Sequence, residues 1–157
     1  MSIQAQVAAA RAGQEPALVC QVPSGWVVLC QMQFLPGYCI LLPDPVVGSL
    51  NDLALPERAQ CLVDMTRVGD ALLAVTGAYR INYAILGNSD PALHAHIVPR
   101  YLDEPEPQRT GLPWSYTQEE MHNRMFDPER DRSLLEKMRF EIQTHLPKSV
   151  SSLPDEG

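Results

Sequence analysis

The chain has 157 residues, of which 45% are hydrophobic and 20% are charged. This length and composition are typical of one globular domain in water. The net charge of −7 argues against a basic surface that binds nucleic acid broadly, whereas a small phosphate ligand needs only local donors.

The cysteines and the apolar stretches indicate the compartment. Cys20, Cys30, Cys39 and Cys61 lie far apart and form no CxxC pair, so we expect buried thiols rather than a disulfide framework. No apolar stretch approaches the roughly 20 residues of a membrane helix, and the N-terminus has no apolar signal-peptide core. We therefore expect a cytoplasmic protein with no membrane partner.

The first half of the predicted domain is β-rich. Residues 1–15 form an N-terminal arm, for which a helix and a frayed segment are both open. Short β-prone runs follow at 18–22, 26–31 and 38–42, and turns that contain Pro and Gly separate them. This pattern predicts a meander of three antiparallel strands.

A long helix follows the meander. Ser49 and Asp52 have the spacing of a capping box, and Pro56 suits a first helical turn. Apolar residues then recur at helical spacing up to Ala74, while charged residues, Asp64 among them, are turned away from that face.

Two further strands, 78–86 and 93–101, are predicted on either side of the turn 87–91. Residues 103–116 are a connector rich in Pro and Glu, in which Trp114 and Tyr116 are candidates to stack on a base or to close a dimer interface.

The C-terminal part is helical. Thr117 opens a short helix with a capping box, and Asp127 opens a second helix that runs to Pro147. The whole is α+β: a five-stranded antiparallel sheet with one long helix and C-terminal helices. The predicted segments are the arm 1–15, a domain over 16–116, a helical extension of the same domain over 117–147, and a solvated tail over 148–157.

The residues with the clearest chemistry are two histidines on one predicted strand. Side chains two apart on a strand share a face, so His94 and His96 point one way and Ala95 and Ile97 point into the apolar layer. The turn Gly87-Asn88-Ser89 beside them offers backbone N–H groups, an amide and a hydroxyl, a donor set that suits phosphate oxygens.

The His-x-His pattern alone leaves other interpretations open. Two partly exposed histidines with ordinary hydrogen bonds produce the same pattern. A metal pair would need further ligands, and Asp90, His122 or His145 would serve only if folding brings them close.

The segment Asn82-x4-Gly87-Asn88-x5-His94-x-His96-Ile-Val-Pro-Arg100 resembles the signature strand and loop of the histidine-triad superfamily. It is most similar to bacterial proteins described as diadenosine-polyphosphate-hydrolase-like, and the resemblance covers roughly residues 18–116. The register places His94 at the middle position of the triad and His96 at the last. The sequence departs from the pattern at Ala92, which replaces the first histidine, and at Asp44, where relatives usually carry basic residues.

The resemblance implies a histidine-triad-like fold and a nucleotide ligand, with no cofactor and no metal, in a homodimer. It implies a hydrolase or transferase that cleaves at the α-phosphate of dinucleoside polyphosphates or nucleoside phosphoramidates. His94 would form a nucleotidyl-histidine intermediate, oriented by the backbone carbonyl of the first triad position, and His96 would donate a proton.

The resemblance also implies ligand-binding roles for the neighbouring residues, although Arg100 equally suits a structural ion pair. The alternatives are a nucleotide-binding protein weakened in catalysis by the loss of the first histidine, and a metal-binding module that uses His94 and His96. Gln31 is predicted to contact a ribose hydroxyl. The other predicted nucleotide and phosphate contacts are Asn82, Gly87, Asn88, Ser89 and Arg100.

Overall fold

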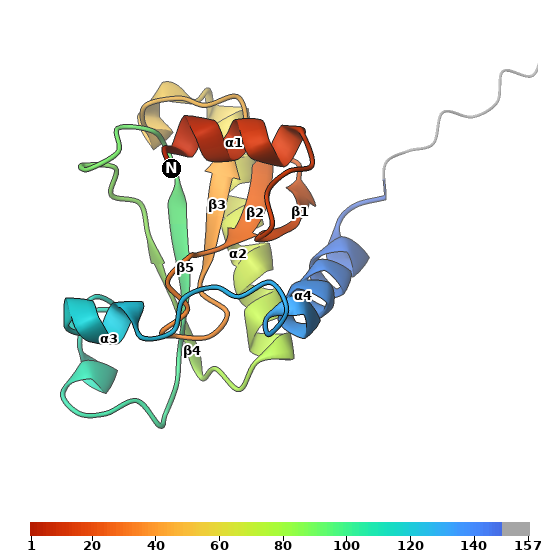
Figure 1. Ribbon diagram of the computed structural model, residues 1–157. Coiled ribbons are helices and arrows are strands. Elements are labelled where there is room, and N and C mark those ends of the chain that lie inside the picture. Colours follow the sequence, from red (N-terminus) through yellow and green to blue (C-terminus); the bar gives the residue numbers. More distant parts are fainter. Residues whose placement is uncertain (149–157) are drawn as a thin grey trace, which may run out of the picture.

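The computed structural model describes residues 1–148 and consists of one five-stranded antiparallel sheet with helices on both faces (Figure 1). The strand order is β1-β2-β3-β5-β4. The predicted sheet and its initial meander are confirmed, with strand ends shifted by one or two residues. The predicted tail lies outside the described residues except for Lys148. The strands are β1 (Leu18–Val22), β2 (Gly25–Leu29), β3 (Cys39–Pro43), β4 (Arg80–Ala84) and β5 (Ala95–Arg100).

One face of the sheet is covered by α2 (Leu55–Val75) and α4 (Arg132–His145). Alternate residues of the strands, such as Leu41 on β3 and Ile97 on β5, meet apolar residues of these helices and are fully buried. The four cysteines are buried and free, as expected of core thiols. Within residues 1–148, no helix is both long and apolar enough to cross a membrane.

The opposite face is covered in part by α1 (Ile3–Arg11), which crosses the strands in Figure 1. Ser2 caps this helix, and its side chain accepts the N–H of Ala5. Ile3 and Val7 are buried against a small cluster that includes Ala92. Of the two conformations left open for the arm, residues 3–11 therefore adopt the docked helix.

Polar contacts hold α1 at both of its ends. At its start, the backbone N–H of Ile3 donates to the carboxylate of Asp90 at 2.9 Å. At its end, Arg11 pairs with Asp44, with Nε 2.8 Å from the carboxylate. Asp44 therefore pairs with α1, and Ala92 belongs to the apolar cluster in which α1 is buried.

The capping boxes are present, but not all of them begin the predicted helix. Ser49 and Asp52 form a capping box on a short 3₁₀ turn (Leu50–Asp52), and α2 begins after it. Thr117 caps α3 (Gln118–His122) as predicted. The start of α4 was predicted too early, because the Asp127 carboxylate accepts the N–H groups of Glu129 and Arg130 and closes a turn before the helix.

β4 is an edge strand of the sheet, and Tyr79 before it and Tyr83 within it are exposed. An edge strand has unpaired backbone groups to which another chain can add. The expected homodimer stays a prediction.

Asp64 on α2 was predicted to face away from the core and is instead completely buried. Its carboxylate accepts the backbone N–H of Ser24 at 2.9 Å and side-chain donors from Gln60 and Arg67. A buried charge with these donors is stabilised where it lies, so Asp64 ties α2 to the β1–β2 turn.

We expect Asp64→Asn to lower the free energy of unfolding by about 2 kcal/mol, because its amide replaces a charged acceptor with a partial donor. Denaturant midpoints measure the loss. Asp70→Asn, on the exposed side of the same helix, is the control and should change stability little. Equal midpoints for the two variants would contradict the role of Asp64.

Candidate functional site

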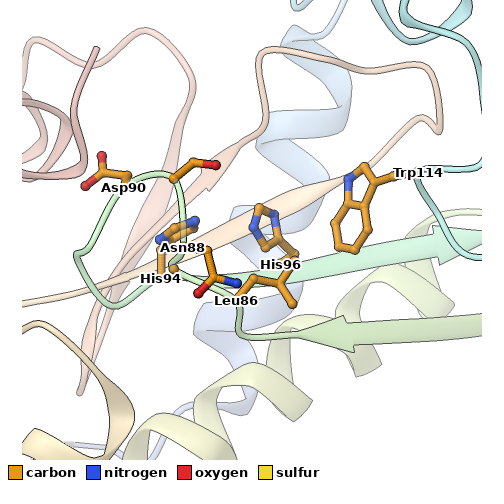
Figure 2. A pocket seen from close by; sticks show the side chains of 8 residues that line it. Leu86, Asn88, Asp90, His94, His96 and Trp114 are labelled. Atoms are coloured by element: carbon orange, nitrogen blue, oxygen red, sulfur yellow. The ribbon is translucent and has the colours of Figure 1, made fainter.

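The predicted turn and the two histidines line a single cavity of about 400 Å³ (Figure 2). Its walls include His94 and His96 together with Gly87, Asn88 and Ser89. A cavity of this size is in the range of small-molecule sites. Folding therefore brings most of the predicted site residues together.

The strand register explains why both histidines face the cavity. His96 pairs with Ile40 of β3, while its neighbours Ala95 and Ile97 are buried beneath α2. His94 lies just before β5 and continues the alternation, so its ring lines the same cavity. The site thus occupies the face of the sheet that α1 covers in part.

The turn beside the histidines presents donors. Gly87 has a φ of 72°, in the left-handed region that favours glycine. Within residues 1–148, the backbone N–H groups of Asn88 and Ser89 donate to no other backbone group. Backbone N–H groups of this kind are donors that suit anionic oxygens.

His94 is held by its own backbone. Its Nδ1 lies 2.8 Å from the carbonyl oxygen of Ala92. A carbonyl only accepts, so neutral His94 carries its proton on Nδ1 and keeps the lone pair of Nε2. The ring is therefore fixed in both its orientation and its tautomer.

His96 lies between His94 and Trp114, with ring centroids 4.9 Å and 5.2 Å away (Figure 2). Burial, and next the neighbouring His94, lower the pKa of His96 from 6.5 to about 4. At neutral pH His96 is therefore an uncharged imidazole that can donate one hydrogen bond from one nitrogen.

Trp114 reaches the cavity because Arg100 holds the connector that carries it. The Arg100 side chain is buried and pairs with Glu104 at 3.0 Å. It also donates to the carbonyl oxygens of Gln108 and Gly111, both at 2.8 Å. Of its two predicted roles, the structure therefore places Arg100 in the structural ion pair, and its donors are not available to phosphate.

Two other predicted contacts lie outside the cavity. The Asn82 side chain accepts a hydrogen bond from Arg100 at 2.9 Å and lines a separate hollow behind Trp114. Gln31 lies beyond the end of β2, against Phe126 and Pro128 in a different cavity. Neither residue lines the histidine cavity: Asn82 on β4 pairs with Val98, two positions beyond His96, and Gln31 follows the end of β2.

The sequence reasoning missed two residues of the site. Leu86 forms part of the wall, and the Tyr38 hydroxyl lies 2.6 Å from Nδ1 of His96. Tyr38 is two residues from Ile40, the strand partner of His96, so the pairing of β3 with β5 is the signal that locates it. The sequence alone does not supply that pairing.

The metal interpretation finds no further ligands. Asp90 lines the cavity but accepts the N–H of Ile3, and His122 and His145 lie on α3 and α4. In the described part of the chain, no group of three His, Cys, Asp or Glu side chains is placed to hold an ion. A closed metal site needs such a group.

We expect Ala92→His to lower the free energy of unfolding by about 1–3 kcal/mol, because the larger side chain must displace α1. Thermal or denaturant unfolding measures the effect. Ala8→His, on the exposed side of α1, introduces the same residue without overpacking and serves as the control. An Ala92→His protein as stable as the control would show that α1 does not depend on a small residue at this position.

We expect the His96 ring to remain neutral at pH 5 and to titrate near its lowered pKa of about 4. Because the unfolded chain binds this proton first, stability should fall as the pH decreases from about 6.5 to about 4. Ring ¹⁵N and ¹H resonances followed against pH measure the titration. A midpoint near 6.5 would contradict the burial of the ring.

No family model and no curated protein matches the sequence, but solved structures resemble the fold. A histidine triad protein from Bradyrhizobium japonicum is 24% identical with a TM-score of 0.68, over 84% of this chain and 94% of that chain. A histidine triad protein from Marinobacter aquaeolei is 20% identical with a TM-score of 0.69, over 81% of this chain and 88% of that chain. A hypothetical histidine triad nucleotide-binding protein from Sulfolobus tokodaii is 14% identical with a TM-score of 0.68, over 89% of this chain and 92% of that chain. The five-stranded sheet and its helices therefore form the histidine-triad fold.

Proposed function

We propose that the chain binds a nucleotide in the cavity between the turn 87–89 and the two histidines. The observation that carries the proposal is the hydrogen bond between Nδ1 of His94 and the Ala92 carbonyl, which leaves Nε2 as a nucleophile. The nucleotide-binding description of the Sulfolobus tokodaii protein supports a nucleotide as the ligand.

The proposed reaction is cleavage at the α-phosphate of a dinucleoside polyphosphate or a nucleoside phosphoramidate. The Nε2 lone pair of His94 attacks the α-phosphorus, so that a P–N bond forms while the bond to the leaving group breaks. His96 donates a hydrogen bond from Nε2 to the leaving group, which departs with the electron pair of the broken bond. Water then hydrolyses the nucleotidyl-histidine, releasing the nucleoside monophosphate and the free imidazole.

The turn 87–89 stabilises the charge that develops on the phosphoryl oxygens. Its backbone N–H groups and the side chains of Asn88 and Ser89 lie on the wall of the same cavity as the two rings. Donors fixed before the reaction stabilise developing negative charge without reorganising, which is a large contribution in enzyme sites.

The replacement of the first histidine by Ala92 leaves the orienting contact intact. The group that fixes His94 is a backbone carbonyl, which alanine supplies as well as histidine. We therefore propose an active enzyme rather than a nucleotide-binding protein that has lost its chemistry. Binding of nucleoside monophosphate in calorimetry, without turnover of any substrate, would favour the weakened protein instead.

We expect His94→Ala to reduce release of nucleoside monophosphate by more than about 10⁴-fold, because the nucleophile is removed. Chromatography of reactions with diadenosine tetraphosphate and with adenosine phosphoramidate measures the rate. Acid-quenched wild type should carry a nucleotidyl adduct in its mass spectrum, and the variant should not.

His122→Ala is the matched control, since His122 is exposed on α3 away from the cavity. Its rate should equal that of the wild type. An unchanged rate in His94→Ala would exclude His94 as the nucleophile, and the absence of turnover in the wild type would exclude hydrolysis of these substrates.

A further inference from the structure

A buried tyrosine lies behind the histidine pair. The Tyr38 hydroxyl is 2.6 Å from Nδ1 of His96, and the Tyr38 side chain is only 1% exposed. Tyr38 immediately precedes β3, where Gln33 fixes the backbone: its side chain donates to the Tyr38 carbonyl and accepts the N–H of Gly37, both at 2.9 Å. The phenol is therefore held in place from its own loop.

The surroundings of the phenol oxygen determine the direction of this hydrogen bond. Within residues 1–148, the Tyr38 hydroxyl forms its hydrogen bond with Nδ1 of His96. A buried hydroxyl proton needs an acceptor, and one nitrogen of a neutral imidazole is an acceptor. Burial raises the pKa of Tyr38, so the hydroxyl keeps its proton. The acceptor that lies within hydrogen-bond distance of that proton is Nδ1 of His96.

We propose that Tyr38 is a positioning residue that donates to Nδ1 of His96 and so directs an Nε2–H of His96 into the cavity. This inference rests on the proposed function, because it assigns the origin of the donor role given there to His96. Tyr38 itself does not line the cavity and touches no reacting atom.

The consequence is that the two neighbouring rings are held in opposite tautomers. The Ala92 carbonyl accepts from Nδ1 of His94, so that ring presents a lone pair on Nε2. The Tyr38 hydroxyl donates to Nδ1 of His96, so that ring presents a proton on Nε2. One ring can then attack a phosphorus while the other donates to an oxygen or a leaving group.

Without the hydroxyl, nothing would select the tautomer of His96. A ring with its proton on Nδ1 would turn a lone pair toward the phosphoryl oxygens, which are themselves acceptors. The unfavourable contact would reduce the rate of the chemical step more than it would reduce binding.

The test is Tyr38→Phe in the full chain, labelled with ¹⁵N and observed through long-range ¹H–¹⁵N correlations of the histidine rings at pH 7. We expect wild-type His96 to be protonated on Nε2 and His94 on Nδ1. In Tyr38→Phe, His96 should become a mixture of tautomers while His94 is unchanged. A wild-type His96 protonated on Nδ1 would overturn the proposal, whether or not the variant folds.

The kinetic readout is a fall in kcat of about 10- to 100-fold in Tyr38→Phe with little change in KM, by analogy with groups that orient ligands of metal sites. Tyr83→Phe is the control. It removes a phenol hydroxyl that lies over Gly69 of α2, on the opposite side of the sheet, and should keep the wild-type tautomers and kcat.

The two proposals fail in different ways. If the wild type has no turnover but its tautomers are as expected, the proposed reaction fails and the positioning role of Tyr38 stands. If turnover occurs and Tyr38→Phe retains both the Nε2–H tautomer and the wild-type kcat, the role of Tyr38 is wrong and the proposed reaction stands.

Discussion

The site depends on the hydrogen bond between the His94 ring and the carbonyl of Ala92. This bond sets the tautomer and the orientation of the His94 ring, and it is made by the backbone two residues earlier. A side chain at position 92 is not needed for it. Alanine at position 92 therefore supplies, through its backbone carbonyl, the contact that orients the His94 ring.

Ala92 and Asp44 both belong to the surroundings of α1. Ala92 shares a buried apolar cluster with Ile3 and Val7, and Asp44 pairs with Arg11 at the end of the same helix. Asp90, on the cavity wall, accepts the first N–H of α1. The arm is thus a docked part of the domain that supports the loop before His94.

Local patterns predicted what local physics determines. Alternation along a strand placed His94 and His96 on one face, and turn residues placed the Gly87–Ser89 loop beside them. Contacts between distant segments were beyond such patterns. Asp64 is buried because Ser24 presents an N–H to it. The Arg100 side chain donates to backbone carbonyls of the connector that follows it in the chain. Tyr38 meets His96 only through the pairing of β3 with β5.

The structural ion pair of Arg100 nevertheless contributes to the chemistry of the site. By holding the connector, Arg100 and Glu104 place Trp114 against the ring of His96. That contact adds to the burial that lowers the pKa of His96. In a charged His96 both ring nitrogens carry protons, so Nδ1 could not accept the proton of the Tyr38 hydroxyl. When the His96 ring is neutral, the single hydrogen bond at Nδ1 determines whether Nε2 presents a proton to the cavity. The buried ion pair of Arg100 and Glu104, although outside the site, therefore helps to define the donor within it.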